Sequence, residues 1–375
     1  MDDMLKVLFI MPTFSAPSEL WMGRMLAALE GNLLAVACYE APVREHLGVP
    51  VFDLGSRKNP ASIAGGEQAI LDLLRANPAS PVLAHYLPFA LRYERVWAKV
   101  ANPLVVHAHG YDLTPDLLRT DAEGRSARFH SRHYPADVVR LSQRALLLAN
   151  SRRSAEKLAA MGVPEGRIVV KYLGVPVPAD WPPRQTIQGR LNCLFLGRLV
   201  DFKGPLETLA AFELAATGGM EGTLTFAGDG PLAGELRAAV ERSPVRERVR
   251  LLGAVPAGVG EELRASSDVF LSHSQVGPTA GQEEALGVAY LEALAAGMPI
   301  ISATGGSLPE VVVSGETGLL TAPGDIAALA VSLLRLSRDP ALYERLSRAA
   351  HADALRRFSD AAERQALHSI LSSVR

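Results

Sequence analysis

The amino-acid sequence predicts an α/β protein with two doubly wound, parallel-sheet domains. The chain has 375 residues, too many for one typical domain and enough for two that each bury a core. Short apolar runs alternate with longer helical patterns along the chain, as in α/β folds. This alternation is interrupted once, at 173–190, where four prolines indicate a linker. Ligands of such sheets bind beyond the C-terminal ends of the strands, so we expect a cleft between the two domains.

The expected strands are continuous apolar runs, which are typical of parallel strands covered on both faces. They include 6–11, 33–38, 104–109, 145–149 and 167–172 in the first half, and 191–197, 223–228, 248–253, 269–272 and 299–304 in the second. Helical patterns lie between them, for example at 18–31 and 205–216, and an amphipathic helix is expected at 360–375.

The bulk composition is that of an ordinary globular protein. Apolar residues make up 48% and charged residues 21%, and the formal net charge of -2 gives no indication of nucleic-acid binding. Cys38 and Cys193 are expected to be core residues in a reducing compartment. No window approaches the roughly 20 apolar residues of a membrane-spanning helix, and the N-terminal run lacks the flanks of a signal peptide. We therefore expect a cytoplasmic protein.

Two cations follow the first strand of the second half, in "FLGRLVDFKGP". Gly197 allows a tight turn, and Arg198 and Lys203 then precede a helix that begins near Pro205. Cations at such a place bind a diphosphate together with backbone N–H groups, although two solvated surface charges remain an alternative. The next strand ends in "FAGDGP", which places Gly228 in a tight loop at the same sheet edge.

The segment "GQEEALGVAYLEALAAG" contains two glutamates eight residues apart, Glu284 and Glu292. On one helix they would be ~12 Å apart along the axis. We expect instead that Gly287 opens the helix, so that Glu284 folds back over its N-terminus. The N–H groups near Gly287, Val288 and Ala289 would then face an anion. The alternative for Glu292 is a carboxylate on a solvated helix face.

The first half carries chemistry at "VVHAHGYDLT". His109, Tyr111 and Asp112 follow a strand, and a histidine beside a glycine at a strand end can reach a cleft. A structural histidine remains the alternative, and His107 is expected to be buried within the strand. After the first strand, Ser15 is expected to cap the following helix.

In this order, these segments resemble the GT-B glycosyltransferases, and within them the retaining family 4 type with an E-x7-E motif. The matching pieces are "HGYD", "GRLVDFKG", "AGDGP", "EALGVAYLEALAAGMPIISATGGSLPEVV" and "GETGLLTAPGD". The resemblance covers most of the chain and is strongest from Cys193 to Ala330. It implies two Rossmann-like domains facing across a cleft: an acceptor domain at 1–180, joined by the C-terminal helix 360–375 that crosses back to it, and a nucleotide-sugar domain at 181–359.

The resemblance also implies roles for single residues. Arg198 and Lys203 match the diphosphate-binding pair, Glu292 matches the ribose-binding carboxylate, and Glu284 matches the carboxylate on the donor sugar. The remaining implied contacts are Val288 and Ala289 to the distal phosphate, His109 near the donor sugar, the base near Gly253, Ala254 and Val255, and Ser15, Tyr111 and Asp112 on the acceptor side. His109, Glu284, Arg198 and Lys203 are the expected catalytic residues.

The acceptor side departs from the family pattern, because "TFSAPSE" stands where many members have a Gly-Gly pair. The loop "SQVGPTAGQEEALG" resembles a subgroup that acts in bacterial exopolysaccharide or lipopolysaccharide assembly. We therefore expect a saccharide or lipid-linked acceptor. Between Arg119 and Lys157, nine Lys/Arg stand against four Asp/Glu. This basic stretch favours peripheral contact with an anionic membrane, and a solvated helical face is the alternative.

The expected reaction is sugar transfer with retention at the anomeric carbon. The chain has no Asp-x-Asp pair, so no divalent metal and no cofactor besides the nucleotide-sugar co-substrate are expected. Two alternatives are a nucleotide-sugar 2-epimerase, which needs no acceptor, and a non-catalytic nucleotide-sugar-binding protein. The donor base and sugar do not follow from the sequence.

Overall fold

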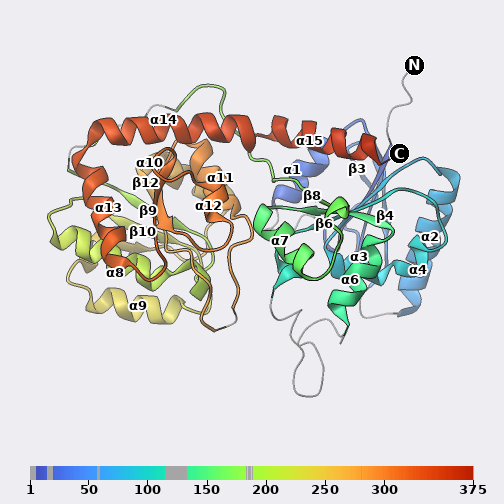
Figure 1. The fold of residues 1–375 in the computed structure, drawn as a ribbon, viewed down its shortest axis with the longest axis horizontal. Helices are drawn as coiled ribbons and strands as arrows, with labels where there is room; N and C mark the ends of the chain where they lie inside the picture. Colours follow the sequence, from blue (N-terminus) through green and yellow to red (C-terminus); the bar gives the residue numbers. More distant parts are fainter. Residues whose placement is uncertain are drawn as a thin grey trace. The chain divides into compact units, whose positions relative to one another are not determined.

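The structure is a computed structural model that describes residues 6–14, 20–56, 60–114, 133–182, 184, 187, 189–279 and 281–374. The chain divides into two compact units, Met1–Gly174 with Asp360–Arg375, and Val175–Ser359 (Figure 1). The sequence analysis places this division at 180, six residues further on. No helix in the described ranges is long and apolar enough to cross a membrane.

The first unit contains an eight-stranded sheet in the order β3-β4-β2-β1-β5-β6-β7-β8. The strands are β1 (Val7–Ile10), β2 (Leu33–Cys38), β3 (Glu45–His46), β4 (Val49–Asp53), β5 (Val82–His85), β6 (Leu104–Ala108), β7 (Ala145–Ala149) and β8 (Ile168–Val170). Every pair is parallel except β3–β4. The chain builds outward from β1 in one direction and then from β5 in the other, so the topological switch point lies between β1 and β5.

Helices pack along this sheet. They are α1 (Leu20–Ala28), α2 (Pro60–Ala76), α3 (Leu87–Arg92), α4 (Glu94–Trp97), η1 (Tyr111–Leu113), α6 (Tyr134–Ser142), α7 (Arg152–Ala160), η2 (Glu165–Arg167) and α15 (Asp360–Ser373). Central strands such as β1 and β6 are buried along their whole length, as expected for continuous apolar runs.

The C-terminal helix α15 is part of the first unit and packs against α1 (Figure 1). An ion pair ties it to the sheet: the Lys171 ammonium, directly after β8, donates to the Glu363 carboxylate. Both side chains are buried, at 0% and 2% exposure. A buried pair of this kind holds its partners in one geometry, because separating them leaves a charge without compensation.

The second unit contains a six-stranded parallel sheet in the order β11-β10-β9-β12-β13-β14. The strands are β9 (Cys193–Leu196), β10 (Leu224–Ala227), β11 (Val249–Leu251), β12 (Val269–Leu271), β13 (Ile300–Ala303) and β14 (Gly318–Thr321). The switch point of this sheet lies between β9 and β12.

The helical segments of the second unit lie between these strands in the sequence, and two more follow the last strand. They are η3 (Asp201–Lys203), α8 (Pro205–Thr217), α9 (Ala233–Arg242), η4 (Arg246–Arg248), α10 (Ala257–Ser266), α11 (Val288–Ala295), α12 (Leu308–Val311), α13 (Ile326–Arg338) and α14 (Pro340–Arg357). Local signals set several starts: Asp325 and Asp339 cap α13 and α14, accepting from the N–H groups of Ala328 and Leu342.

The structure contains strands that the sequence analysis does not name. These are β3, β4, β5 and β14. The omission of β5 matters most, because this four-residue strand lies at the centre of its sheet, between β1 and β6. Its apolar run is short and follows the turn-rich "NPASP", so periodicity gives it little signal.

Candidate functional site

Three neighbouring strands of the second unit end in glycines that lie against one another. The Gly228 N–H donates to the Gly253 carbonyl at 2.7 Å, and the Gly197 N–H donates to the Ala227 carbonyl at 3.0 Å. A Cβ on Gly228 would lie 1.8 Å from the Gly197 carbonyl oxygen, so no other residue fits there. Gly253 and Ala254 are exposed and Val255 is half-buried. This sheet edge is therefore bare backbone that a ligand can approach closely.

Lys203 and Glu284 meet at the switch point of the second sheet. Lys203 ends η3, after β9, and Glu284 lies in the loop after β12. The Lys203 ammonium donates to the Glu284 carboxylate, and the two side chains are 15% and 11% exposed. The two loops are also joined by backbone, because the Gln275 N–H donates to the Phe202 carbonyl at 2.9 Å.

The charge on Lys203 is set by its surroundings. Burial alone would lower the pKa of Lys203, but the Glu284 carboxylate and the Tyr290 side chain together raise it above its ordinary value. The Arg198 guanidinium acts in the opposite sense, which places its positive charge near Lys203. Arg198 itself is exposed. The raised pKa keeps Lys203 protonated at neutral pH, with the charge of Arg198 close enough to act on it.

Glu284 folds back toward the start of α11, as the sequence analysis expects. Gly287 adopts φ 76° as the N-terminal cap of α11, and a Cβ there would lie 2.3 Å from the Tyr290 ring and 3.2 Å from the Glu284 carboxyl carbon. The Ser307 N–H donates to the Glu284 carbonyl at 3.0 Å. The first helical residues, Val288 and Ala289, are half-buried, and the first N–H groups of a helix have no partner within it.

Glu292 lies about one turn into α11 and has a cation of its own. Its carboxylate lies 3.0 Å from the Arg264 guanidinium of α10. The sequence analysis does not anticipate Arg264. One basic residue in the last turn of a helix is too common to attract attention, and only the ion pair between α10 and α11 identifies it. Glu292 is 18% exposed, so it is neither buried nor on an open solvated face.

The predicted residues of the first unit surround a different kind of site. His109 follows β6, and its Nε2 lies 3.0 Å from Nδ1 of His85. The Trp21 ring centroid lies 4.1 Å from that of His109. Nδ1 of His109 is buried. His107 is fully buried, as expected. His85 is absent from the sequence prediction because β5 is absent from it.

Asp112 organises the loop after β6. Its carboxylate accepts from the N–H groups of Leu87 at 3.0 Å and His109 at 2.8 Å, and its side chain is fully buried. Burial raises the pKa of Asp112 to about 6, although four backbone N–H groups act to lower it. Tyr111 is exposed, whereas Ser15 lies outside the described residues. Of the three acceptor-side predictions, only Tyr111 therefore presents a side chain to solvent in the described part of the chain.

Comparison with known proteins finds glycosyltransferases that the second unit resembles. Residues 180–353 match the family model "Glycosyl transferases group 1". The chain is 32% identical over 213 residues to the amylovoran biosynthesis glycosyltransferase AmsK of Erwinia amylovora, covering 56% of this chain and 51% of that protein. It is 32% identical over 264 residues to glycogen synthase of Mycobacterium tuberculosis, covering 67% and 61%. The chain thus spans about half the length of the first relative and somewhat more of the second.

The fold comparison extends over both units. The crystal structure of Anabaena Alr3699/HepE in complex with UDP matches with a TM-score of 0.77 at 20% identity, covering 98% of this chain and 100% of that one. The predicted fold class is thereby confirmed. The chain has the GT-B fold, and its second unit resembles the glycosyltransferases of group 1, among them enzymes of bacterial polysaccharide synthesis.

Proposed function

We propose that the protein is a glycosyltransferase that moves a sugar from a nucleotide-diphosphate sugar to a saccharide or lipid-linked acceptor in bacterial polysaccharide or glycolipid assembly. The observation that carries the proposal is the meeting of Lys203, Glu284 and the α11 N-terminus at the switch point of the second sheet. The matched family model covers this segment, and the similar Anabaena structure holds UDP.

The donor diphosphate is expected to bind at Lys203, Arg198 and the first N–H groups of α11. Both side chains are cationic at neutral pH, and a helix N-terminus favours an anion. Glu284 is expected to accept hydrogen bonds from donor-sugar hydroxyls. Its ion pair with Lys203 keeps both groups in place before the donor arrives, so that little reorganisation is needed when it binds.

Glu292 is the expected partner of the ribose hydroxyls. Arg264 holds its carboxylate from the side of α10 at 3.0 Å, which fixes the direction of the carboxylate. The base is expected beside Gly253, Ala254 and Val255, where the chain is exposed or half-buried. His109 is proposed to act near the donor sugar. Such a role requires its ring to turn, since Nε2 faces His85 and Nδ1 is buried.

We also propose that transfer retains the anomeric configuration and needs no divalent metal at the donor diphosphate. Lys203, Arg198 and the α11 dipole would stabilise the charge that develops on the departing diphosphate. The acceptor proton would pass to the departing phosphate oxygen. Proton NMR of the first product tests retention, because an inverted anomer contradicts it. Turnover that survives treatment with EDTA supports independence from a divalent metal.

Contact with a membrane remains a narrower proposal. In the described part of the basic stretch, Arg140 pairs with Glu94 and Asp137, and Arg153 pairs with Glu156. These pairs reduce the positive charge available to anionic lipid. Vesicles containing phosphatidylserine should bind the protein at low salt and release it at high salt if the contact is electrostatic. Absence of binding at low salt would leave a cytoplasmic protein without peripheral contact.

One experiment separates the proposed function from its alternatives. A thermal-shift screen over UDP-, GDP-, ADP- and dTDP-sugars identifies the donor, because a ligand of the folded state raises apparent stability. Release of free nucleoside diphosphate is then measured with and without acceptor saccharides. Release that depends on acceptor supports a transferase. Isomerisation of the donor sugar without acceptor indicates the 2-epimerase, and a stabilising donor that is never consumed indicates a binding protein.

A further inference from the structure

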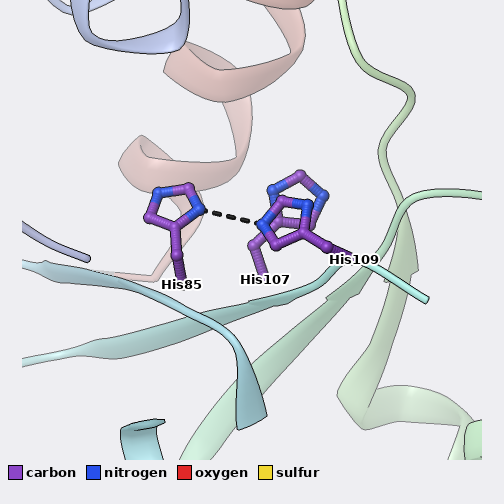
Figure 2. A group of neighbouring side chains, drawn as sticks. All are labelled: His85, His107 and His109. Atoms are coloured by element: carbon purple, nitrogen blue, oxygen red, sulfur yellow. Dashed lines mark hydrogen bonds between the residues drawn. The ribbon is translucent and has the colours of Figure 1, made fainter. Parts of the chain in front are cut away.

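Three histidines of the first unit gather at the C-terminal ends of two neighbouring strands, next to the switch point. His85 ends β5, His107 lies in β6 and His109 follows it. His85 and His107 are register partners in the β5–β6 pair, and His107 and His109 lie two residues apart on one strand face. One ring nitrogen of each lies within 4.8 Å of the others, and the rings converge as shown in Figure 2.

The hydrogen bonding of this cluster is incomplete. A neutral imidazole has one donor and one acceptor nitrogen, so three rings present three lone pairs. Within the described residues, the contact between His85 and His109 satisfies one of them. Nε2 of His85 and Nδ1 of His109 are buried without a hydrogen-bond partner in the same part of the chain, and His107 has at most one weak partner for its two buried nitrogens, the Lys171 backbone. Buried polar atoms without partners are costly, and such a group calls for a bound water or ion.

The donor set fits a transition-metal ion. Two nitrogens bound to one tetrahedral Zn²⁺ at 2.0–2.1 Å lie about 3.3 Å apart, close to the 3.0 Å between His85 and His109. All three nitrogens lie within 4.8 Å of one another, so the His107 nitrogen must approach the other two by up to about 1.5 Å to reach the same geometry. Three neutral nitrogens and no oxygen in this group suit Zn²⁺ and not Mg²⁺ or Ca²⁺, which prefer oxygen ligands.

We propose that His85, His107 and His109 form a binding site for Zn²⁺, with the fourth position left to water; the site is filled while His109 faces His85 and empties when the His109 ring turns toward the donor sugar. The walls around the rings restrain them: Phe9 lies 4.3 Å from His85 and Trp21 lies 4.1 Å from His109, centroid to centroid. The Lys171 ammonium acts on all three rings and opposes a cation, but the Glu363 carboxylate paired with it offsets that field. The sequence analysis expects no metal because it considers only carboxylates that are close together in sequence. The three histidines come from two different strands.

The test is direct measurement of metal binding by the full chain without a histidine tag. The protein is stripped with a chelator and titrated with Zn²⁺ in competition with a chromophoric chelator. One Zn²⁺ per chain is expected. Co²⁺ as a substitute should give the intense visible absorption of a four-coordinate site. X-ray absorption at the zinc edge should count three imidazole ligands, and this readout needs no variant and no enzymatic activity.

Variants then assign the ligands. His85→Gln and His107→Gln should each weaken Zn²⁺ binding by about 10²-fold or more, since loss of even an outer-shell partner costs 10–100-fold. The control is His133→Gln, which removes an exposed histidine of the same unit and should leave binding unchanged. If the buried variants fail to fold, His109→Gln replaces them, because that side chain is only half-buried. Absence of Zn²⁺ binding by the wild type, equal binding by the variants, or a zinc edge without three imidazoles overturns the proposal.

Discussion

The two units use opposite electrostatics at the sheet edges where ligands are expected. In the second unit, each site carboxylate is held beside a cation, as Lys203–Glu284 and Arg264–Glu292. In the first unit, the corresponding edge carries uncharged rings, since burial lowers the pKa of His85 to about 3 and those of His107 and His109 well below the ordinary value. A buried ion pair of that unit, Lys171–Glu363, lies in its interior.

This difference indicates what each edge is built to receive. A diphosphate accepts charge-assisted hydrogen bonds from the cations of these preformed pairs. It is also stabilised by a helix N-terminus. The neutral imidazoles at the edge of the first unit offer lone pairs and N–H groups, which suit sugar hydroxyls or a metal ion that prefers neutral nitrogen. The predictions below test this contrast between the ion-paired carboxylates of the second unit and the neutral histidines of the first.

The largest effect is expected where the first unit holds its buried charges. Lys171→Met leaves the Glu363 carboxylate buried without a partner, which should lower the free energy of unfolding by about 3–5 kcal/mol. The measurement is a urea unfolding curve followed by circular dichroism. The double variant Lys171→Met/Glu363→Leu should recover much of the loss, because no charge is then left unpaired. A single variant as stable as the wild type would contradict the role of this pair.

A smaller, pH-dependent effect is expected from Asp112. Its pKa is about 6 in the folded protein against an ordinary value of 3.8, so the folded state holds the proton more tightly than the unfolded state. The stability from this group is therefore present below pH 4 and is lost as pH rises toward 6. The difference between the two pKa values corresponds to about 3 kcal/mol.

The matching variant is Asp112→Asn, which cannot titrate. The difference in unfolding free energy between wild type and variant should fall as pH rises from 4 to 6, and should then stay level. Unfolding curves at each pH measure it. A difference that is independent of pH would show that the Asp112 carboxyl has the same pKa in both states.

Much of the fold follows from the sequence because buried parallel strands leave continuous apolar runs. The predicted strands 33–38 and 145–149 coincide with β2 and β7. The end of α11 is also predictable from the sequence. Gly297 has φ 66°, the left-handed conformation that ends helices. Strand β5 could not be predicted in the same way. It has only four residues between turn-forming segments, too few to show a hydrophobic periodicity.

The site could be predicted only where its residues are close in sequence or carry a motif. Glu284, Gly287 and Glu292 lie in one segment, and their local geometry follows from the glycine. Partners across segments are set by strand order alone, so Arg264 and His85 have no local signal. His85 shows how a missed strand becomes a missed site: only the β5–β6 register places it beside His107.

In the second unit, the charge on Lys203 is expected to matter most for turnover. Lys203→Ala removes a cation from the departing diphosphate and should lower kcat by about 10²-fold or more. Initial rates of nucleoside diphosphate release at saturating donor measure the effect. Lys99→Ala removes an exposed lysine of the first unit and serves as the control. Unchanged turnover in Lys203→Ala would remove Lys203 from the leaving-group role and weaken the contrast between the units.

The smallest effect is expected at Glu292. If its carboxylate accepts hydrogen bonds from the ribose hydroxyls, Glu292→Gln should raise KM for the donor about tenfold and leave kcat nearly unchanged, because this contact is the same in ground and transition states. A donor with a 2′,3′-dideoxyribose tests the assignment: the wild type should discriminate against it and the variant should not. Arg264→Met should act in the same direction, since it frees the carboxylate it now holds at 3.0 Å. Equal discrimination by wild type and Glu292→Gln would place the ribose elsewhere and leave the Arg264–Glu292 pair a structural contact, like Lys171–Glu363 in the first unit.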